Sequence, residues 1–166
     1  MIELIIAVAV LAADMITKYL AATYWLTPVT LISGVVQLTY VENVGAAWGM
    51  LGGARLFFIV ITVIFCGLII AAYVRNRNSM LRYSKVVLAL VFSGALGNLI
   101  DRIIFGYVRD MIQPLFIDFP VFNIADSAIV IGTILLIIEV LFMKNNLFHV
   151  IEEDLKTLKR KKKKDE

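Results

Sequence analysis

The sequence is poor in the residues on which much enzyme chemistry depends. Among its 166 residues there is one cysteine, Cys66, and one histidine, His149. A disulfide within the chain and a cysteine-based metal site are therefore excluded. Histidine-based acid/base catalysis, Ser-His-Asp triads and histidine-rich metal sites are disfavoured, because the one histidine lies in a polar stretch near the end of the sequence. Any chemistry must rest on carboxylates or lysine, and we expect no metal and no cofactor.

Charged residues are also scarce. They make up 17% of the chain, apolar residues make up 61%, and the mean hydropathy is +0.89. A soluble domain typically has about 25% charged and about 45–50% apolar residues, and a disordered chain is more polar still. Four apolar segments are each long enough to span a bilayer. They cover residues 2–22, 55–74, 85–105 and 122–143.

The fold class that follows is an all-α membrane protein with four transmembrane helices. The first segment resembles a signal sequence, but no lysine or arginine precedes it, and Asp14 and Lys18 interrupt it. We therefore expect a retained helix rather than a cleaved peptide. Residues 1–144 are expected to form the membrane domain, and residues 145–166 a basic tail.

The positions of lysine and arginine predict the orientation in the membrane. Four of them lie between the second and third segments, and seven more lie in the tail 145–166, whereas the connections 23–54 and 106–121 contain only Arg109. Cytoplasmic connections are enriched in these residues. Both termini should therefore be cytoplasmic in a multi-pass protein of the cell membrane. The run from Lys159 to Lys164 is expected to lie near anionic phospholipid. We do not expect nucleic-acid binding, because no folded basic face accompanies that run.

The first outer connection is long enough to fold on its own. The stretch from Val35 to Val41 is rich in β-forming residues and ends near Gly45 and Gly49. We expect a small sheet on the outer membrane surface within about residues 24–54. The aromatic residues Tyr24, Trp25 and Trp48 suit the membrane interface there.

Ionisable residues inside spanning segments are costly and indicate function. At about 1.5 Å per residue, Asp14, Lys18, Asp101 and Asp126 converge at the depth of the outer leaflet. Structural explanations are available for each. Asp14 and Lys18 are spaced for an intrahelical ion pair, and Asp101 and Arg102 could satisfy each other or a neighbour.

Two further local patterns concern helix packing and capping. Small and polar residues occupy one face of the third segment, which allows close helix approach. They are Ser93, Gly94, Gly97, Asn98 and Asp101. Asn123 is placed to cap the fourth segment, with Asp126 at the third helical position, where a carboxylate interacts favourably with the helix dipole.

Five ordered motifs carry a resemblance to a known family. They are Asp14-x-x-x-Lys18, the stretch from Asn43 to Gly49 (NVGAAWG), the stretch from Gly94 to Arg102 (GALGNLIDR), Val108-Arg109-Asp110, and the stretch from Phe122 to Ser127 (FNIADS). Over residues 1–144 the sequence resembles lipoprotein signal peptidase, or signal peptidase II, a family of bacterial intramembrane aspartyl proteases. In this chain the link from Asp110 to Asp126 is short, and the tail extends beyond the family core.

The resemblance implies both a site and a substrate. Asp110 and Asp126 would be the catalytic pair, and the other matching positions would support the site or bind substrate. These are Asp14, Lys18, Asn43, Gly45, Gly97, Asn98, Asp101, Arg102, Asn123 and Ala125. The implied substrate is a prolipoprotein whose cysteine carries a diacylglyceryl group, cleaved just before that cysteine. The implied fold adds an extracytoplasmic β-cradle and a short amphipathic surface element, and we expect a monomer in the bacterial inner membrane.

Two carboxylates that share one proton can hydrolyse a peptide bond without histidine, cysteine or metal. Two rival functions remain open at this point. A small ion- or proton-coupled transporter would use Asp14, Lys18, Asp101 and Asp126 as a relay across the membrane. A Ser/Lys peptidase would use Lys18 as the base for Ser127 or Ser93.

Overall fold

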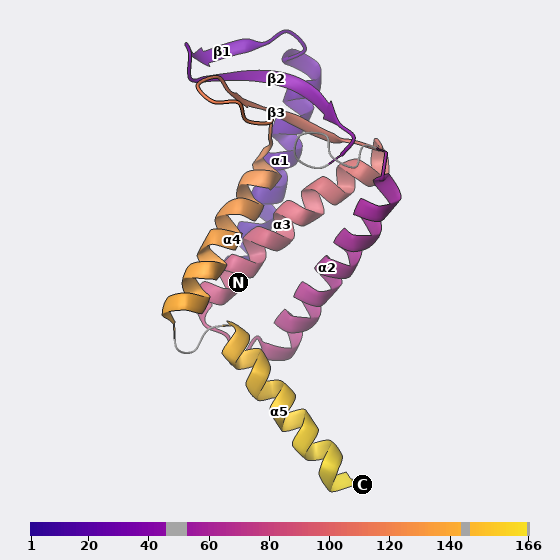
Figure 1. The fold of residues 1–166 in the computed structure, drawn as a ribbon, viewed down its shortest axis with the longest axis vertical. Helices are drawn as coiled ribbons and strands as arrows, with labels where there is room; N and C mark the ends of the chain where they lie inside the picture. Colours follow the sequence, from indigo (N-terminus) through magenta and orange to yellow (C-terminus); the bar gives the residue numbers. More distant parts are fainter. Residues whose placement is uncertain (46–52, 144–146, 166) are drawn as a thin grey trace.

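The computed structural model describes residues 1–45, 53–143 and 147–165 (Figure 1). Four helices in it are long and apolar enough to cross a bilayer. They are α1 (Ile2–Tyr24), α2 (Arg55–Asn76), α3 (Arg82–Ile104) and α4 (Ile124–Phe142). The four predicted segments are thereby confirmed, with ends that differ by at most three residues. Trp48 and the end of the motif that runs from Asn43 to Gly49 lie outside the described residues.

Helix α3 lies at the centre of the bundle and packs against α1, α2 and α4 (Figure 1). It has 12 buried residues, whereas α2 has three. Its predicted small-residue face makes this packing possible. A Cβ atom on Gly97 would lie 2.5 Å from Asp14 Oδ2, and one on Gly94 would lie 2.8 Å from the Ile129 side chain. Glycine at these two positions allows α1 and α4 to approach α3 closely.

A three-stranded antiparallel sheet lies at one end of the bundle, which we call the sheet end (Figure 1). Its strands are β1 (Val29–Ile32), β2 (Val36–Asn43) and β3 (Val108–Pro114), in the order β1-β2-β3. Gly34, with a φ of +70°, lies in the turn between β1 and β2, a conformation that glycine adopts without steric cost. Strand β2 confirms the sheet predicted within residues 24–54.

Strand β3 was not predicted. The connection 106–121 has no clean alternation of apolar and polar residues, because the first four residues of β3 are all buried. Asp110, which taken alone has the pattern of a loop aspartate, instead pairs with Val41 of β2. Beyond β3 the chain folds back, and Phe122 pairs with Ile112. This return brings the start of α4 next to the middle of β3.

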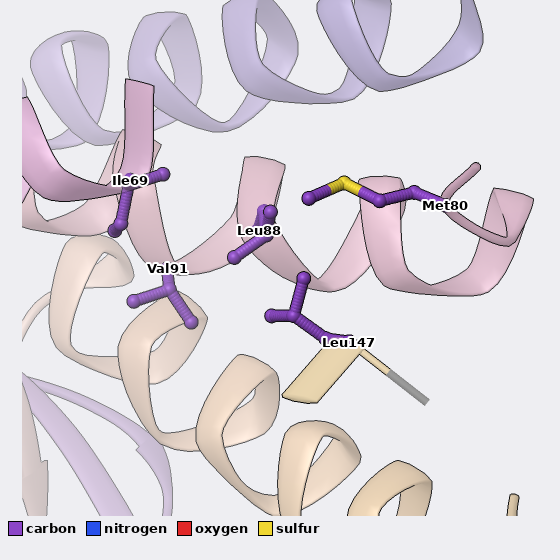
Figure 2. Packing of buried hydrophobic residues seen from close by; sticks show 5 residues of the cluster. All are labelled: Ile69, Met80, Leu88, Val91 and Leu147. Atoms are coloured by element: carbon purple, nitrogen blue, oxygen red, sulfur yellow. The ribbon is translucent and has the colours of Figure 1, made fainter. Parts of the chain in front are cut away.

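The opposite end of the bundle, which we call the tail end, is closed by a fifth helix, α5 (Leu147–Asp165). Leu147, at its start, packs into an apolar cluster with residues of α2, α3 and the turn between them (Figure 2). The other members of this cluster are Ile69, Met80, Leu88 and Val91. The sequence predicts this segment only as a basic tail, so its helix is a finding of the structure. The N-terminus lies at the same end, where the Tyr73 hydroxyl donates to Glu3 Oε1 at 2.9 Å.

Candidate active site

Asp110 and Asp126 come together at the sheet end through Asn123. The Asn123 side-chain amide donates to Asp110 Oδ1 at 2.6 Å, and its backbone N–H donates to Asp126 Oδ2 at 3.1 Å. The Asn123 side-chain oxygen also accepts from the backbone N–H of Asp126 at 2.8 Å, which completes a capping box at the start of α4. The predicted cap is therefore confirmed, and the same residue holds both carboxylates.

Two further asparagines hold one carboxylate each. Asn43, at the end of β2, donates to Asp110 Oδ2 at 3.0 Å. Asn98, on α3, donates to Asp126 Oδ1 at 2.7 Å. Every carboxylate oxygen of the pair therefore accepts a hydrogen bond from an amide. Such bonds fix the orientation of a carboxylate and satisfy its charge.

A buried ionic network lies directly behind the pair. Lys18 Nζ lies 2.8 Å from Asp14 Oδ2 and 3.4 Å from Asp101 Oδ2, and all three side chains are fully buried. Lys18 also donates to Asn98 Oδ1 at 2.9 Å, which links the network to the amide that holds Asp126. Arg109 closes the network from β3, with Nη2 at 2.7 Å from Asp101 Oδ1.

This network also fixes the register of the helices. Asp14 Oδ1 accepts from the backbone N–H of Ala125 at 2.9 Å, in the first turn of α4. Ala125 is fully buried, and its Cβ lies 3.3 Å from where a Cβ on Gly97 would be. Asp14, Gly97 and Ala125 therefore join α1, α3 and α4 at the level of the carboxylate pair.

The surroundings of Asp110 favour its protonated form. Its exposed fraction is 1%, and burial together with the neighbouring charge of Asp126 raises the pKa of Asp110 to about 7. The hydrogen bonds from Asn43 and Asn123 oppose this shift in pKa. Near neutral pH, Asp110 can therefore hold a proton next to a second carboxylate, as general acid catalysis requires.

Two cavities meet at Asp126. One, of about 240 Å³, is lined by residues from β2, β3, α3, α4 and the segment before α4, including Asp110 and Asp126. The other, of about 500 Å³, lies between α2, α3 and α4, and its lining is mostly apolar. Asn98, Arg102 and Asp126 line both cavities. Asp101 is absent from both linings and is fully buried.

Arg102 stands apart from the buried network. Its Nη2 donates to the backbone oxygen of Gly45 at 3.1 Å, and its guanidinium lies 4.9 Å from the centre of the Phe58 ring. It makes no ion pair with its neighbour Asp101, which pairs with Lys18 and Arg109 instead. Its partly buried charge therefore faces the cavities.

The structure brings together the predicted site residues, and it weakens both rival interpretations. Ser93 Oγ donates to the backbone oxygen of Leu90, and Ser127 Oγ donates to that of Asn123. Lys18 is held by acids and Asn98, so neither serine is placed to use it as a base. A relay across the membrane is also disfavoured, because the buried network is confined to the sheet end.

Sequence reasoning missed two residues that position the site. Arg109 occurs in one of the quoted motifs, but the motif alone indicates no role for it in the site, whereas in the structure it pairs with Asp101. Arg55 donates from Nε and Nη2 to the backbone oxygens of Arg102 and Ile103, both at 2.8 Å, and so caps the end of α3. The position of Arg109 next to Asp110 was a usable signal, whereas nothing in the sequence indicated the role of Arg55.

Comparisons with known proteins identify the family of this chain. The family model described as signal peptidase (SPase) II matches residues 6–142. The lipoprotein signal peptidase of Caldanaerobacter subterraneus subsp. tengcongensis is 48% identical over 138 residues, which cover 80% of this chain and 91% of that protein. The lipoprotein signal peptidase of Enterococcus faecalis is 48% identical over 107 residues, 64% of this chain and 66% of that protein.

A solved structure is similar over nearly the same part of the chain. It is a bacterial membrane enzyme determined by the in meso method at 2.3 Å resolution, with a TM-score of 0.77 and 39% sequence identity. The similarity covers 84% of this chain and 87% of that one. The family match contains both carboxylates, the three asparagines and the ionic network behind them, and it ends before α5. The chain therefore belongs to the signal peptidase II family of proteases.

Proposed function

We propose that the chain is an aspartic-type intramembrane endopeptidase in which Asp110 and Asp126 are the catalytic residues. The observation that carries the proposal is the bridging of the two carboxylates by Asn123, with contacts of 2.6 and 3.1 Å. The pKa of about 7 at Asp110 supports a pair that carries a single proton near neutral pH. Both carboxylates and the Asn123 that bridges them belong to one chain, and we propose that the enzyme is a monomer.

In the proposed reaction, protonated Asp110 donates a hydrogen bond to the scissile carbonyl oxygen, and ionised Asp126 takes a proton from the attacking water. Oxygen–carbon bond formation gives a tetrahedral intermediate, and the proton of Asp110 passes to its oxygen. When the carbon–nitrogen bond breaks, Asp126 gives its proton to the leaving nitrogen and Asp110 recovers one from the intermediate. Both carboxyl groups return to their starting states, and no covalent intermediate forms.

The amides and the ionic network have a supporting role in this proposal. Asn43, Asn98 and Asn123 orient the two carboxylates through their hydrogen bonds. Lys18, with its acidic partners Asp14 and Asp101, holds Asn98 and the start of α4 in place. None of these six residues needs to contact the scissile bond.

We further propose that the substrate is a diacylglyceryl-modified prolipoprotein, cleaved just before its lipidated cysteine. The relatives reported above are named for lipoprotein signal peptidase activity. The mostly apolar cavity of about 500 Å³ between α2, α3 and α4 suits an apolar part of such a substrate. Arg102, which lines both cavities, and Gly45, which lines the smaller one, are placed to orient the substrate backbone.

The proposed orientation places the sheet end in the outer leaflet and both termini in the cytoplasm of a bacterial cell. It rests on four basic residues near the tail-end turn between α2 and α3, which are Arg75, Arg77, Arg82 and Lys85. Cytoplasmic connections are enriched in such residues. A site near the outer surface is also accessible to water, which hydrolysis requires.

The proposal is tested with purified protein and a diacylglyceryl-modified precursor. Cleavage is followed by the change in gel mobility for the wild type, Asp110→Asn and Asp126→Asn. We expect the wild type to cleave before the modified cysteine, which mass spectrometry of the product identifies, and both variants to be inactive but folded. Retained processing by either variant would exclude the assigned pair. Equal cleavage of an unmodified precursor would exclude the lipid requirement.

A further inference from the structure

Helix α5 carries an apolar stripe that is covered by the bundle only at its start. Leu147 is buried and Ile151 is partly buried against the bundle. At 100° per residue, Phe148, Leu155 and Leu158 fall on the same side of the helix as these two. Their exposed fractions are 57%, 51% and 39%. The stripe that docks α5 on the bundle thus continues, uncovered, along the next two turns.

The depth of α5 relative to the spanning helices is given by the cluster around Leu147 (Figure 2). Ile69 lies seven residues before the end of α2, and Leu88 lies six residues after the start of α3, so both are about 10 Å inside the tail end of the bundle. Leu147 packs at that level. From there α5 runs obliquely to the spanning helices and away from the bundle (Figure 1), so its uncovered stripe lies at the level of the membrane–water boundary.

The charges of α5 are divided along its length. Its acidic residues Glu152, Glu153 and Asp154 come first, and Asp154 is bound to the bundle through an ion pair with Arg75. Six consecutive basic residues follow, from Lys159 to Lys164. The half of α5 that leaves the bundle is therefore strongly cationic, and an anionic surface is its electrostatic complement.

We propose that α5 is an interfacial helix that binds the anionic leaflet at the tail end of the bundle. Leu155, Leu158 and Phe148 insert between lipid headgroups, while Lys159 and Arg160 contact headgroup phosphates. Apolar insertion combined with basic contacts is the physical signature of helices that lie on membranes. The family match ends at residue 142, so α5 lies outside it, and the proposed contact is independent of the proposed peptidase activity.

A membrane surface fits these observations better than nucleic acid or a second copy of the chain. Nucleic acid would complement the basic run but would leave the apolar stripe exposed. A second copy would cover the stripe but would place two clusters of six cations close together. The bilayer in which the bundle is embedded can both cover the apolar stripe and supply anionic headgroups for the basic run. Leu147 already attaches α5 to the bundle at the level of the membrane boundary.

The proposal is tested on the full chain with single fluorescent labels. In a Cys66→Ala background, Leu158→Cys places a label on the stripe, and Lys156→Cys places a matched label on the opposite side of the same turn. The protein is reconstituted in vesicles of phosphatidylcholine with about 30% phosphatidylglycerol, including lipids with a nitroxide near the headgroup. We expect the nitroxide to quench the label at position 158 and to leave the label at position 156 in water.

The charge requirement is tested on the same labels. We expect quenching at position 158 to fall in pure phosphatidylcholine and in about 0.5 M NaCl, which screens exposed charges. The double variant Lys159→Gln, Arg160→Gln should lower the ratio of bound to free α5 by about thirtyfold, since each basic residue near such a surface contributes about fivefold.

Three outcomes would overturn the proposal. The first is equal quenching, or none, at positions 156 and 158. The second is quenching at position 158 that is unchanged in pure phosphatidylcholine. The third is a water-exposed label at position 158 together with retention of an RNA oligonucleotide that the double variant loses, which would assign α5 to nucleic acid.

Discussion

Buried acids occur at both ends of the helix bundle, but they are held in different ways. At the sheet end, Asp14 and Asp101 share Lys18, and Asp101 also binds Arg109. At the tail end, fully buried Glu139 accepts from the Ser84 hydroxyl at 2.5 Å and from the backbone N–H of Leu147 at 2.8 Å. Its second oxygen has no hydrogen-bond partner among the described residues.

The difference indicates what each end requires. Ion pairs at the sheet end fix three helices and a strand around two carboxylates, whose relative position matters for chemistry. Glu139 joins only α3 and the start of α5 to α4. Two neutral donors, the Ser84 hydroxyl and the Leu147 N–H, are enough to hold these elements together. Ser84 and Asp101 are 17 residues apart on α3, or about 25 Å, so changes at one end should leave the other end intact.

The largest expected contrast is between Asp110→Asn and Glu139→Gln. The first removes the proton donor of the proposed reaction and should lower kcat/KM by about 10²–10⁴-fold. The second keeps an oxygen that can accept from Ser84 and should leave kcat/KM unchanged. Both values are measured with a lipidated precursor in the same detergent. A comparable loss in Glu139→Gln would mean that the two ends are coupled.

The next contrast concerns stability. Lys18→Met leaves Asp14 without a cation in a fully buried position and should lower the free energy of unfolding by about 3–5 kcal/mol. Lys85→Met, on the same bundle but at the tail end and only partly buried, should have little effect. Thermal unfolding of the two purified variants measures the difference. Equal melting temperatures would show that the network contributes nothing to the fold.

The sequence predicts the two ends to different degrees. Apolar length identifies the four helices, and the spacing of Asp14 and Lys18 predicts their ion pair, because both signals are local. The pairing of β3 with β2 depends on residues about 70 positions apart, and no local pattern reports it. Glu139 presents only as a charge near a helix end. Its burial depends on α5, whose docking is set by Leu147 and a cluster of distant residues.

Glu139→Leu should break the tail end without affecting chemistry. The Ser84 hydroxyl and the Leu147 N–H would each lose their acceptor, at a cost of about 1–3 kcal/mol for each orphaned buried donor. We expect faster amide hydrogen exchange at the start of α5 and unchanged exchange in β3. Glu139→Gln, which keeps one acceptor oxygen, should lie close to the wild type. Protection of α5 that is equal in Glu139→Leu and wild type would contradict a role for Glu139 in holding the start of α5.

Gly97→Ala tests the close approach of α1 and α3 at the sheet end. The added Cβ would lie 2.5 Å from Asp14 Oδ2, so a helix or the carboxylate must shift, at a cost of about 1–3 kcal/mol. Gly67→Ala on α2 is the matched control, because its Cβ would meet nothing within 4 Å. Thermal unfolding should separate the two variants, and an equal change in melting temperature would show that the contact is not tight.

The smallest expected effect is a shift in the pH dependence of cleavage. Asp110 must be protonated in the proposed reaction, so kcat/KM in the wild type should fall as the pH rises through the Asp110 pKa of about 7. The Asn43 amide stabilises the ionised form and lowers that pKa. Asn43→Ala should therefore move the fall in kcat/KM to higher pH, by less than about one unit. Gln37→Ala, at another position on β2, removes a 2.7 Å hydrogen bond to Gln113 of β3 and should leave the profile in place. If Asp110 were instead the ionised base, kcat/KM would rise with pH through the Asp110 pKa, and Asn43→Ala would move that rise, rather than the fall, to higher pH. A shifted rise with an unchanged fall would therefore reverse the assigned roles.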